Sequence, residues 1–379
     1  MKILLVSNYL PDQQASMLRY ATMLERGLRA RGHDASTISP PERLLRLFRR
    51  APAPVAKWIA YVDKFLLAPW WLAARARHAD LVHVCDHSNS MYLRHTGGRP
   101  SVITCHDLLA VFAARGRFPE ERIGFTGKML QRWIASGLLR APYVVCVSRK
   151  TKDDLQELAA GHAPPSTVLH NPLNWHFHPV PADETRRVFS ARGLDEAPEY
   201  LVHVGGNSWY KNRPAVVRIF AALKRSSAFA QTRLILAGKP WNRELRTLVA
   251  ASEVSSDILE WTEVSNEEVR ALYSGARALL FPSREEGFGW PILEAQACGC
   301  PVITTDRAPM TEVAGGAAIL IDPDRADEAA ATILSQLGRL PALRAQGLQN
   351  ASLFSLDRAL DGYIAAYEHA LASQRLQAR

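Results

Sequence analysis

The chain has 379 residues, of which 47% are hydrophobic and 22% are charged, a composition typical of globular proteins. This length exceeds that of one ordinary hydrophobic core and is expected to give two domains. The formal net charge of +9 favours acidic partners such as phosphorylated ligands or anionic lipid. Nucleic acid is not expected as a partner, because the sequence contains no zinc-finger or RNP-like pattern.

The cysteines and the apolar runs indicate the compartment. The chain has five cysteines, an odd number that argues against a disulfide framework, so a reducing compartment is expected. The start, "MKILLVSNYLP", has four consecutive apolar residues, whereas the apolar region of a signal peptide needs about 7–15. The longest apolar run, 65–74, contains a proline and is about half as long as a bilayer span. We therefore expect a cytoplasmic protein without a segment that crosses a membrane.

Short β-branched segments alternate with longer helical patterns along the chain, which is typical of βαβ units and parallel sheets. The strands predicted in the first half are 2–7, 34–39, 81–85, 101–105, 143–147 and 166–170, with helices such as 14–31 and 122–140 between them. Those predicted in the second half are 199–205, 232–238, 257–261, 278–282, 301–305 and 317–322, and the chain is helical after about 325. The pattern predicts an α/β fold of two doubly wound domains, with the linker in the Pro-, Asn- and His-rich segment 170–184.

One segment departs from this alternation. Residues 41–80 contain eight Lys or Arg and three acids, a net charge of +5, interleaved with Leu, Phe and Trp. This pattern is typical of a helix that lies in a membrane interface, with its cations facing anionic headgroups. It is equally typical of an ordinary helix that buries its aromatic residues in the first domain, since helical spacing does not separate the two. An anionic membrane surface is therefore a candidate partner of this segment.

Residues 278–305 carry the strongest local pattern in the chain. A buried strand, "ALLFPS", is followed by the loop "REEGFG", by a helix with a proline in its first turn, and by the strand "PVITT". The amides of Gly287, Phe288 and Gly289 and the helix N-terminus are expected to converge on one point, which makes an anion site suited to a diphosphate. The two glycines let the backbone approach a ligand closely, because they have no Cβ.

Two carboxylates, Glu286 and Glu294, bracket this anion site. A carboxylate beside a phosphate site is repelled unless it accepts hydrogen bonds from hydroxyls. A nucleotide sugar has hydroxyls on both sides of its diphosphate, so the pattern predicts a sugar-nucleotide site. In the alternative interpretation, Glu286 is a surface acid and Glu294 a charge that favours its helix dipole.

A second candidate for donor binding lies in "VHVGGNSWYKNRP", at 202–214. Gly205, Gly206 and Asn207 form a flexible turn that a phosphate can approach, and Lys211 supplies a compact cation near the start of a helix. A Gly-Gly turn alone is weak evidence, and an exposed lysine is usually a solvated charge. The turn is a better candidate for phosphate binding because it follows a strand, as the anion site does.

His106 is the candidate in the first domain. It follows the strand 101–105, at the sheet edge where doubly wound domains bind ligands. There it could donate to a sugar hydroxyl or position an acceptor. The alternative is a histidine packed within its loop, and His83 in the middle of a strand is expected to be structural in that way.

Together these segments resemble the retaining glycosyltransferases of family 4, which have the GT-B fold. "EEGFGWPILEA…GCPVITTD" resembles the E-x7-E segment of that family, and the other matching segments appear in the family's order: "HDLL", "VVCVSRKTKDDL", "VLHNP", "VGGNSWYKN", "LILAG" and "ALYSGARALLFPS". The resemblance implies two Rossmann-like domains facing a central cleft. These are an acceptor-side domain at 1–172 and a nucleotide-sugar-binding domain at 173–355, followed by a C-terminal helix at 356–379 that packs back on the first domain.

The resemblance also implies an activity. It predicts a metal-independent retaining hexosyltransferase that needs no cofactor and uses a UDP- or GDP-linked sugar as co-substrate. The acceptor would be a glycan or a lipid-linked saccharide, in the assembly of bacterial surface polysaccharide or lipopolysaccharide. The protein is then expected in the cytoplasm, peripherally on the inner face of the plasma membrane.

The family's residue roles can be carried over to matching positions. Glu286 would contact hydroxyls of the donor sugar and Glu294 the nucleotide ribose, while Lys211 would neutralise the diphosphate and His106 would face the transferred sugar. No second acid is obviously placed for a covalent glycosyl intermediate. The resemblance instead implies front-face attack, in which the leaving diphosphate helps to deprotonate the acceptor.

The sequence departs from the family's pattern in two places. Gly206 stands where the family commonly has an arginine, and Asn207, Ser208 and Arg213 are the candidates to compensate for it. The segment "PDQQASM" replaces the usual glycine-rich turn after the first strand, which indicates a modified acceptor side. Two other functions compete with glycosyl transfer. One is a non-catalytic GT-B protein that binds sugar or lipid, and the other is a nicotinamide-dependent oxidoreductase, for which the G-x-G-x-x-G pattern is missing.

Overall fold

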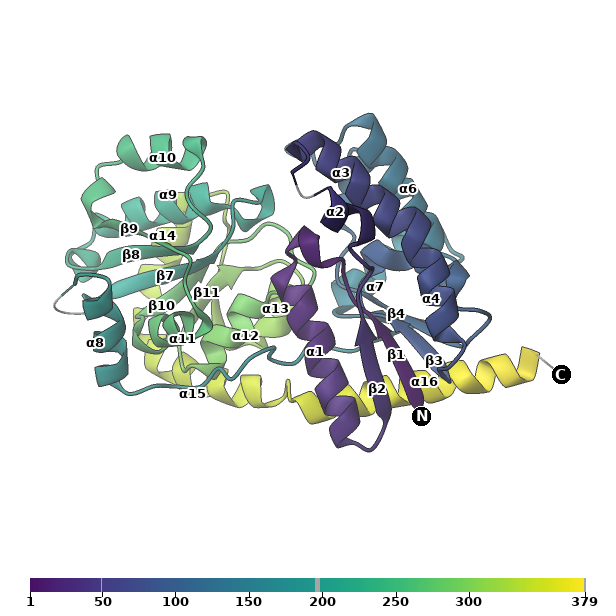
Figure 1. The fold of residues 1–379 in the computed structure, drawn as a ribbon. Helices are drawn as coiled ribbons and strands as arrows, with labels where there is room; N and C mark the ends of the chain where they lie inside the picture. The colour runs from purple at the N-terminus through teal and green to yellow at the C-terminus, as the bar shows by residue number, and fades with distance from the viewer. Residues whose placement is uncertain (49, 195–197, 378–379) are drawn as a thin grey trace. The chain divides into compact units, whose positions relative to one another are not determined.

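The computed structural model describes residues 1–48, 50–194 and 198–377, which form two compact units (Figure 1). The first unit comprises Met1–Asn174 together with the chain from Leu356 onward, and the second comprises Trp175–Ser355. Each unit contains one parallel six-stranded sheet whose strands are connected through helices. The prediction of an α/β fold with two doubly wound Rossmann-like domains is therefore confirmed.

In the first unit the strand order is β2-β1-β3-β4-β5-β6, and every pairing is parallel. The strands are β1 (Lys2–Val6), β2 (Asp34–Ile38), β3 (Leu81–Val84), β4 (Ser101–Cys105), β5 (Val144–Cys146) and β6 (Ser166–Val168). The helices are the 3-10 helix η1 (Leu10–Asp12), α1 (Ala15–Ala30), α2 (Arg43–Leu47), α3 (Ala53–Val62), the π-helix η2 (Asp63–Leu67), α4 (Ala68–Ala76), the 3-10 helix η3 (His87–His95), α5 (Leu109–Ala114), α6 (Phe125–Leu138), α7 (Arg149–Leu158) and α16 (Leu356–Gln377).

In the second unit the order is β12-β11-β10-β7-β8-β9, again with parallel pairing throughout. The strands are β7 (Tyr200–Gly205), β8 (Arg233–Gly238), β9 (Ile258–Thr262), β10 (Ala278–Phe281), β11 (Val302–Thr305) and β12 (Ala318–Ile321). The α-helices are α8 (Ala182–Ala191), α9 (Arg213–Lys224), α10 (Arg243–Ala250), α11 (Asn266–Gly275), α12 (Trp290–Ala297), α13 (Met310–Ala314), α14 (Ala326–Ser335) and α15 (Leu340–Ser352). The 3-10 helices are η4 (Trp209–Lys211), η5 (Ser227–Phe229), η6 (Ser255–Asp257) and η7 (Leu337–Arg339).

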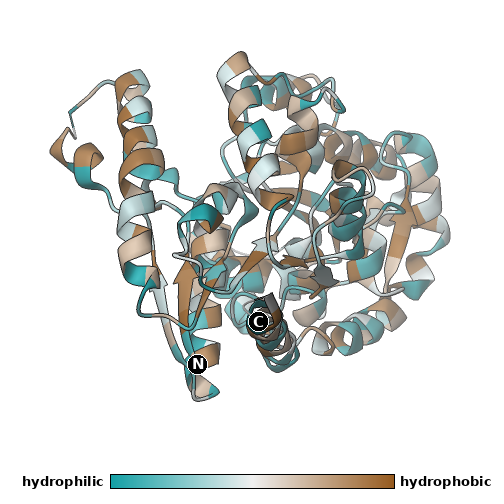
Figure 2. Ribbon diagram, turned by 90° about the vertical axis from the view of Figure 1, so that its right-hand side faces the viewer, coloured by the Kyte–Doolittle hydropathy of each residue, from teal (hydrophilic) through white to brown (hydrophobic). Residues whose placement is uncertain are grey.

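Each of the twelve predicted strands is present, and no strand end differs from its prediction by more than two residues. The central strands are buried along their whole length, as the patterns of β3, β4 and β10 show. A strand covered on both faces by helices reads as an uninterrupted apolar run, so its signal in the sequence is local and strong. Figure 2 shows these hydrophobic runs along the strands, with hydrophilic residues on outer helical turns.

The long C-terminal helix α16 packs on α1 and on the sheet of the first unit (Figure 1). Its Tyr363 and Tyr367 are fully buried. The hydroxyl of Tyr367 lies 2.8 Å from His83 Nδ1, and the hydroxyl of Tyr363 lies 3.2 Å from Thr104 Oγ1, which in turn is 2.8 Å from His83 Nε2. Burial lowers the pKa of His83 to about 3, so its ring is neutral and serves as one donor and one acceptor in this network. His83 is thus structural, as expected.

The helices α2, α3, η2 and α4 lie within residues 41–80, follow one another along the chain and connect β2 to β3 (Figure 1). Trp58 and Trp70 are 60% and 82% exposed, and α3 has no buried residue. The interpretation that this segment buries its aromatic residues is therefore wrong for these two tryptophans. Within the described part of the chain, no helix is both long and apolar enough to span a membrane.

Tyr363→Ala is expected to destabilise the first unit by about 3–5 kcal/mol, because it removes a buried ring and the hydroxyl that meets Thr104 and Tyr20. Tyr363→Phe keeps the ring and should cost only about 1 kcal/mol. Guanidinium unfolding followed by near-ultraviolet circular dichroism measures both. Equal stability of the two variants would show that α16 does not depend on this contact.

Candidate functional site

The site in the second unit forms where the strand order of its sheet reverses. β7 and β10 are neighbours, although about 70 residues separate them in the chain. From β7 the sheet continues to β8 and β9, and from β10 it continues the other way to β11 and β12. At such a point the connections leave toward opposite faces, so the carboxyl ends of the two strands leave space for a ligand. The turn after β7 and the loop after β10 both lie there.

A buried ion pair joins these two connections. Lys211, at the end of η4, donates from Nζ to Glu286 Oε1 over 2.7 Å. Their side chains are 17% and 9% exposed. Burial alone would lower the pKa of Lys211, but the adjacent Glu286 carboxylate, with Tyr210 and Glu294 adding to it, raises that pKa above its ordinary value. The structure therefore brings together a cation and a carboxylate that sequence analysis placed in separate motifs.

The turn after β7 brings a second lysine beside the first. A Cβ on Gly205 would lie 3.6 Å from Lys211 Cδ, and a Cβ on Gly206 would lie 3.7 Å from Lys239 Cγ. Lys239 follows β8 directly and is exposed. Lys239 was not predicted from the sequence, although a cation directly after the strand "LILAG" indicates a charge at the ligand-binding edge of the sheet. Each of the two adjacent glycines thus lies next to one lysine.

Close approach of two strands demands a glycine at the end of β8. Gly238 pairs with Gly205, and a Cβ on Gly238 would meet the Gly205 carbonyl oxygen at 2.1 Å. Its φ of 133° is also one that residues with a side chain rarely adopt. Gly238 therefore keeps the backbone of the turn at Gly205 in place.

The loop after β10 is held by contacts at its start and its end. At its start, the Arg284 amide donates to the Tyr210 carbonyl over 2.8 Å, and the Thr305 hydroxyl donates to the Ser283 carbonyl over 3.0 Å. At its end, Phe288 is buried against the ring of Phe354 at 6.0 Å. The loop reaches α12 through Gly289, the N-cap, whose φ of 104° favours glycine. Gly287 lies half-buried between these two fixed ends.

Glu294 lies in α12, which begins at Trp290 with a proline in its first turn, as predicted. Its carboxylate is 9% exposed and accepts a hydrogen bond of 3.3 Å from the hydroxyl of Tyr273. Burial raises the pKa of Tyr273 well above its ordinary value, and the Glu294 carboxylate raises it further, so this hydroxyl stays a donor. Glu294 is thus a buried, oriented acceptor rather than a surface charge that only favours a helix dipole.

Arg213 is one of the three residues considered as a replacement for the arginine missing at Gly206. It is buried, and its Nη1 donates to Asn207 Oδ1 over 2.8 Å and to the Lys239 carbonyl over 2.9 Å. Burial lowers the pKa of Arg213 to about 10. Asn207 also donates to the Pro240 carbonyl, over 2.7 Å. Arg213 and Asn207 therefore hold the two strand-end turns together, and the exposed cation beside Gly206 is Lys239.

In the first unit, His106 lies at the carboxyl end of β4, as predicted, and is buried. Its Nε2 is 3.0 Å from the Cys85 carbonyl, and its ring makes an edge contact with Tyr20 at 4.9 Å. Burial lowers the pKa of His106 below its ordinary value, although Asp86 opposes this shift. At neutral pH, His106 is thus a neutral ring that donates from Nε2, held in one orientation.

A carboxylate that sequence analysis did not select lies near His106. Asp86 follows β3 and accepts a hydrogen bond of 2.5 Å from Asn8 Nδ2 and another of 2.9 Å from the Ser88 amide. His87 Nδ1 lies 3.2 Å from its Oδ1. Burial would raise the pKa of Asp86, but His87 above all, with His106 and Asn8, holds it below its ordinary value. An ionised, buried acceptor therefore stands at the strand ends of this unit.

The described ranges contain no group of three or more His, Cys, Asp or Glu side chains that could hold a metal ion. Lys211 pairs with Glu286, and Lys239 lies beside Gly206. The five cysteines are all free and buried.

Two protein-family models match successive parts of the chain. The model for Glycosyltransferase Family 4 matches residues 17–175, and the model for Glycosyl transferases group 1 matches residues 184–351. Among solved structures, the fold is similar to a sucrose-phosphate synthase from Thermosynechococcus elongatus, with a TM-score of 0.74 at 18% identity over 98% of this chain and 99% of that one. The chain belongs to the GT-B glycosyltransferases. The family resemblance seen in the sequence is thereby confirmed.

This glycosyltransferase also has named relatives of similar length. It is 25% identical to the O-antigen chain mannosyltransferase B of Escherichia coli, over 94% of this chain and 91% of the relative. It is 26% identical to the O-antigen chain mannosyltransferase RfbU of Salmonella typhimurium, over 67% of this chain and 65% of that protein. Its fold is also similar to that of Anabaena HepE, solved in complex with UDP, with a TM-score of 0.73 at 15% identity over 97% of this chain and 100% of that one.

Gly238→Ala is expected to destabilise the second unit by more than about 2 kcal/mol, because the new Cβ overlaps the Gly205 carbonyl and the backbone is strained. Gly206→Ala is the matched control, since its Cβ meets only Lys239 Cγ at an ordinary 3.7 Å. It should change stability by less than about 0.5 kcal/mol. Thermal unfolding measures the stability of both variants. Equal melting temperatures would show that the second unit does not require a glycine at position 238.

Proposed function

We propose that this glycosyltransferase transfers a hexose, with retention, from a UDP- or GDP-linked donor to a glycan or a lipid-linked saccharide. The single observation that carries the proposal is the buried pair of Lys211 and Glu286 beside the turn at Gly205 and Gly206. The O-antigen relatives support a place in bacterial surface polysaccharide assembly. The structure of HepE with UDP supports a nucleotide-linked donor.

The donor diphosphate is assigned to the glycine turn. Gly205 and Gly206 present backbone without side chains, and Lys211 and Lys239 flank them. Two lysines near a diphosphate would offset much of its charge, as a bound cation does in other transferases. The loop at Gly287, Phe288 and Gly289, which leads into the N-terminus of α12, would add backbone donors and the positive end of the helix dipole.

The two glutamates are assigned to hydroxyls on either side of that diphosphate. Glu294, already oriented by Tyr273, would accept hydrogen bonds from the nucleotide ribose. Glu286 would accept from hydroxyls of the donor sugar, with Lys211 keeping its charge compensated. In the first unit, His106 is assigned to a sugar hydroxyl, because the Cys85 carbonyl fixes its ring through Nε2 and leaves Nδ1 as an acceptor in the neutral ring.

The proposed reaction is a front-face displacement. The bond between the anomeric carbon and the diphosphate breaks, and a new bond forms on the same face with the acceptor oxygen. The acceptor proton passes to the leaving diphosphate. Negative charge grows on that diphosphate as the sugar becomes oxocarbenium-like, and Lys211 and Lys239 would stabilise this charge in the transition state. A covalent route would need a second carboxylate at the sugar.

The protein is further proposed to work in the cytoplasm, peripherally on the inner face of the plasma membrane. The support is the segment 41–80, with its net charge of +5 and its exposed Trp58 and Trp70. An acceptor that carries a lipid would be met at such a surface.

Glu294→Gln is expected to weaken the binding of UDP or GDP by about 1–3 kcal/mol, because a neutral amide accepts ribose hydroxyls less strongly than a carboxylate. This corresponds to about 5- to 150-fold in affinity. Glu253→Gln makes the same change of charge at an exposed position of the second unit and should leave affinity unchanged. Isothermal titration calorimetry with each nucleotide measures the difference. Equal affinity of Glu294→Gln and wild type would remove Glu294 from the ribose site.

Transfer is expected to proceed at its full rate in excess EDTA, because lysines rather than a metal ion compensate the diphosphate. The measurement is product formation from UDP- or GDP-hexose with a saccharide acceptor, with the anomeric configuration of the product read by NMR. Activity that disappears with EDTA and returns with Mg²⁺ or Mn²⁺ would contradict metal independence. An inverted product would contradict retention.

A further inference from the structure

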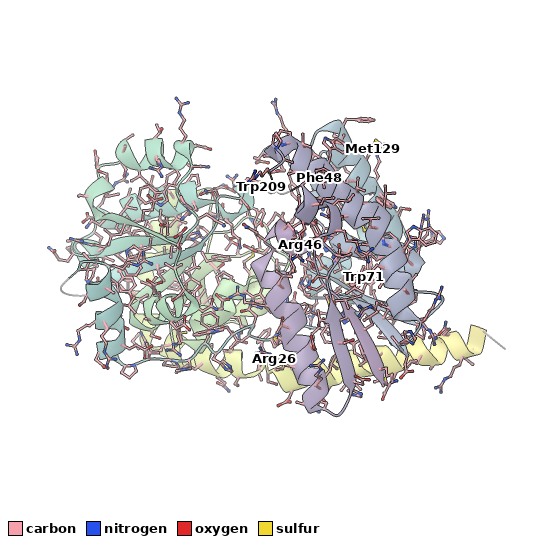
Figure 3. All side chains as sticks on the ribbon, in the orientation of Figure 1. Arg26, Arg46, Phe48, Trp71, Met129 and Trp209 are labelled. Atoms are coloured by element: carbon pink, nitrogen blue, oxygen red, sulfur yellow. The ribbon has the colours of Figure 1, made fainter. Side chains whose placement is uncertain are left out.

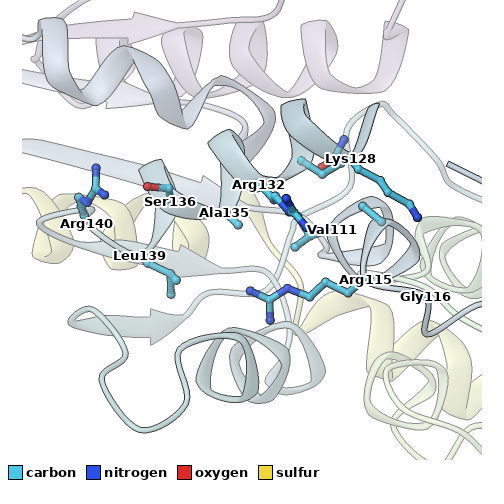
Figure 4. A pocket seen from close by; sticks show the side chains of 11 residues that line it. Val111, Arg115, Gly116, Lys128, Arg132, Ala135, Ser136, Leu139 and Arg140 are labelled. Atoms are coloured by element: carbon cyan, nitrogen blue, oxygen red, sulfur yellow. The ribbon is translucent and has the colours of Figure 1, made fainter. Parts of the chain in front are cut away.

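A basic groove lies between α5 and α6 in the first unit (Figure 4). Its volume is about 710 Å³, and four of the side chains that line it are cations: Arg115, Lys128, Arg132 and Arg140. No Asp or Glu is among the described residues that line it. Figure 4 shows Arg115 and Arg132 extending from the two sides toward the middle of the groove.

The four cations have no partner within the described chain, where none of them takes part in an ion pair or a side-chain hydrogen bond. All four are exposed. Their neighbour Arg117 differs, because it pairs with Glu157 and lies 3.7 Å from Asp154. Acidic side chains that can pair with arginine are thus present in this region, but none of them pairs with the four cations of the groove. Like charges gathered around a cavity create a positive potential that attracts an anion.

The floor of the groove suits a compact anion. Ala114, Gly116, Ala135 and Ser136 are small and leave room between the cationic side chains. Arginine presents a planar fork of N–H donors that matches two oxygens of a phosphate at once. Three arginines and a lysine around small residues therefore fit a phosphate group better than a single carboxylate.

The adjacent face of α6 is apolar and uncovered. Phe125, Met129 and Trp133 recur every four residues and so share one face of the helix, where they are 77%, 54% and 38% exposed. Lys128 and Arg132 lie on the next face, toward the groove. The opposite side of α6 is buried, with Ile134 and Leu138 in the interior. An exposed aromatic row beside cations is the pattern of a helix that lies in a lipid interface.

The aromatic row continues toward the segment 41–80. Trp133 contacts Phe65 at a centroid distance of 5.1 Å, Phe65 contacts Tyr61 at 5.4 Å, and Tyr61 contacts Trp58 at 5.6 Å. Figure 3 labels Phe48 and Met129, both more than half exposed, at the same end of the first unit.

Buried polar contacts fix this end of the unit to its body. Asp63 in η2 accepts the Leu44 and Leu45 amides over 2.9 and 3.0 Å, and it accepts the Tyr9 hydroxyl over 3.0 Å. Asp63 thus ties α2 and η2 to the loop after β1.

We infer that the groove between α5 and α6 binds the phosphate of an anionic membrane lipid while Phe125, Met129 and Trp133 enter the bilayer interface. The apolar row decides for a lipid headgroup over free phosphate, since a soluble anion gains nothing from exposed aromatic residues. The inference rests on the proposed function only in placing the protein at an anionic membrane. It adds a defined phosphate site outside the segment 41–80.

The test is sedimentation with vesicles of phosphatidylcholine containing phosphatidylglycerol, at low salt, with pure phosphatidylcholine as the neutral surface. The variant Arg115→Gln/Arg132→Gln/Arg140→Gln should bind the anionic vesicles about 100-fold more weakly, because each cation at a membrane contributes about fivefold. Arg26→Gln/Arg218→Gln/Arg243→Gln removes the same charge from exposed arginines elsewhere and should bind as wild type does. If both variants lose the same vesicle affinity, net charge is the cause of binding and the groove is not a specific lipid site.

Two further variants separate the other outcomes. Phe125→Ser/Met129→Ser should also weaken vesicle binding. If it has no effect, and inorganic phosphate raises the melting temperature of wild type but not of the groove variant, the groove is a free-phosphate site and the lipid assignment fails. Arg46→Glu/Arg50→Glu tests the segment 41–80. If only this variant loses vesicle binding, and the variants of the groove and of the apolar row keep it, then α6 does not contact the membrane and the inference is overturned.

Nucleotide binding distinguishes this inference from the proposed function. UDP or GDP affinity and turnover with a soluble acceptor should be unchanged in the groove variant, because its residues lie in the first unit and outside the donor site. Loss of vesicle binding with intact nucleotide binding supports the inference. If wild type binds vesicles as described but binds no nucleotide, the donor assignment fails while the membrane site stands.

Discussion

Lys211 and Glu286 belong to separate connections of one sheet, and the 2.7 Å contact between them lies at the centre of the site that we propose binds the donor. A buried charge is costly unless a partner compensates it, so either residue alone would destabilise the second unit. The pair is possible because β7 and β10 are neighbours where the strand order reverses. With the pair in place, the glycine turn, the loop that leads to α12 and the carboxylate of Glu294 keep defined positions around one space.

The first unit contains two buried polar networks, one around His83 and one around Asp86. His83 is neutral and shares hydroxyl partners with the tyrosines of α16, whereas Asp86 stays ionised among Asn8, His87 and His106. Burial alone would neutralise both groups. The difference lies in their partners, since hydroxyls satisfy a neutral ring, whereas the imidazole of His87 and the amide of Asn8 favour an ionised carboxylate. One network anchors the C-terminal helix, and the other leaves an oriented acceptor at the strand ends.

The surface of the first unit also carries concentrated charge, in the groove between α5 and α6. Lys211 lies beside the carboxylate of Glu286, whereas the groove between α5 and α6 gathers Arg115, Lys128, Arg132 and Arg140 with no acid among its described lining residues. Such an arrangement is unfavourable in isolation and becomes favourable when a phosphate enters. The exposed row at Phe125, Met129 and Trp133 is likewise unfavourable in water and favourable in lipid. We infer that one partner, an anionic lipid, compensates the charge of the groove and covers the apolar row.

The sequence by itself determined the twelve strands and the candidates Lys211, Glu286, Glu294 and His106, because buried parallel strands and strand-end turns leave local patterns. It did not show that Lys239 lies beside Gly206, or that Asp86 lies near His106, because the order of strands in a sheet is decided by packing between distant segments. Nor could it decide whether the aromatic residues of 41–80 are buried, since an interfacial helix and a core helix share the same 3.6-residue period. The groove of α6 exists only because α5 packs against that helix, so tertiary structure alone brought Arg115 to the cations of α6.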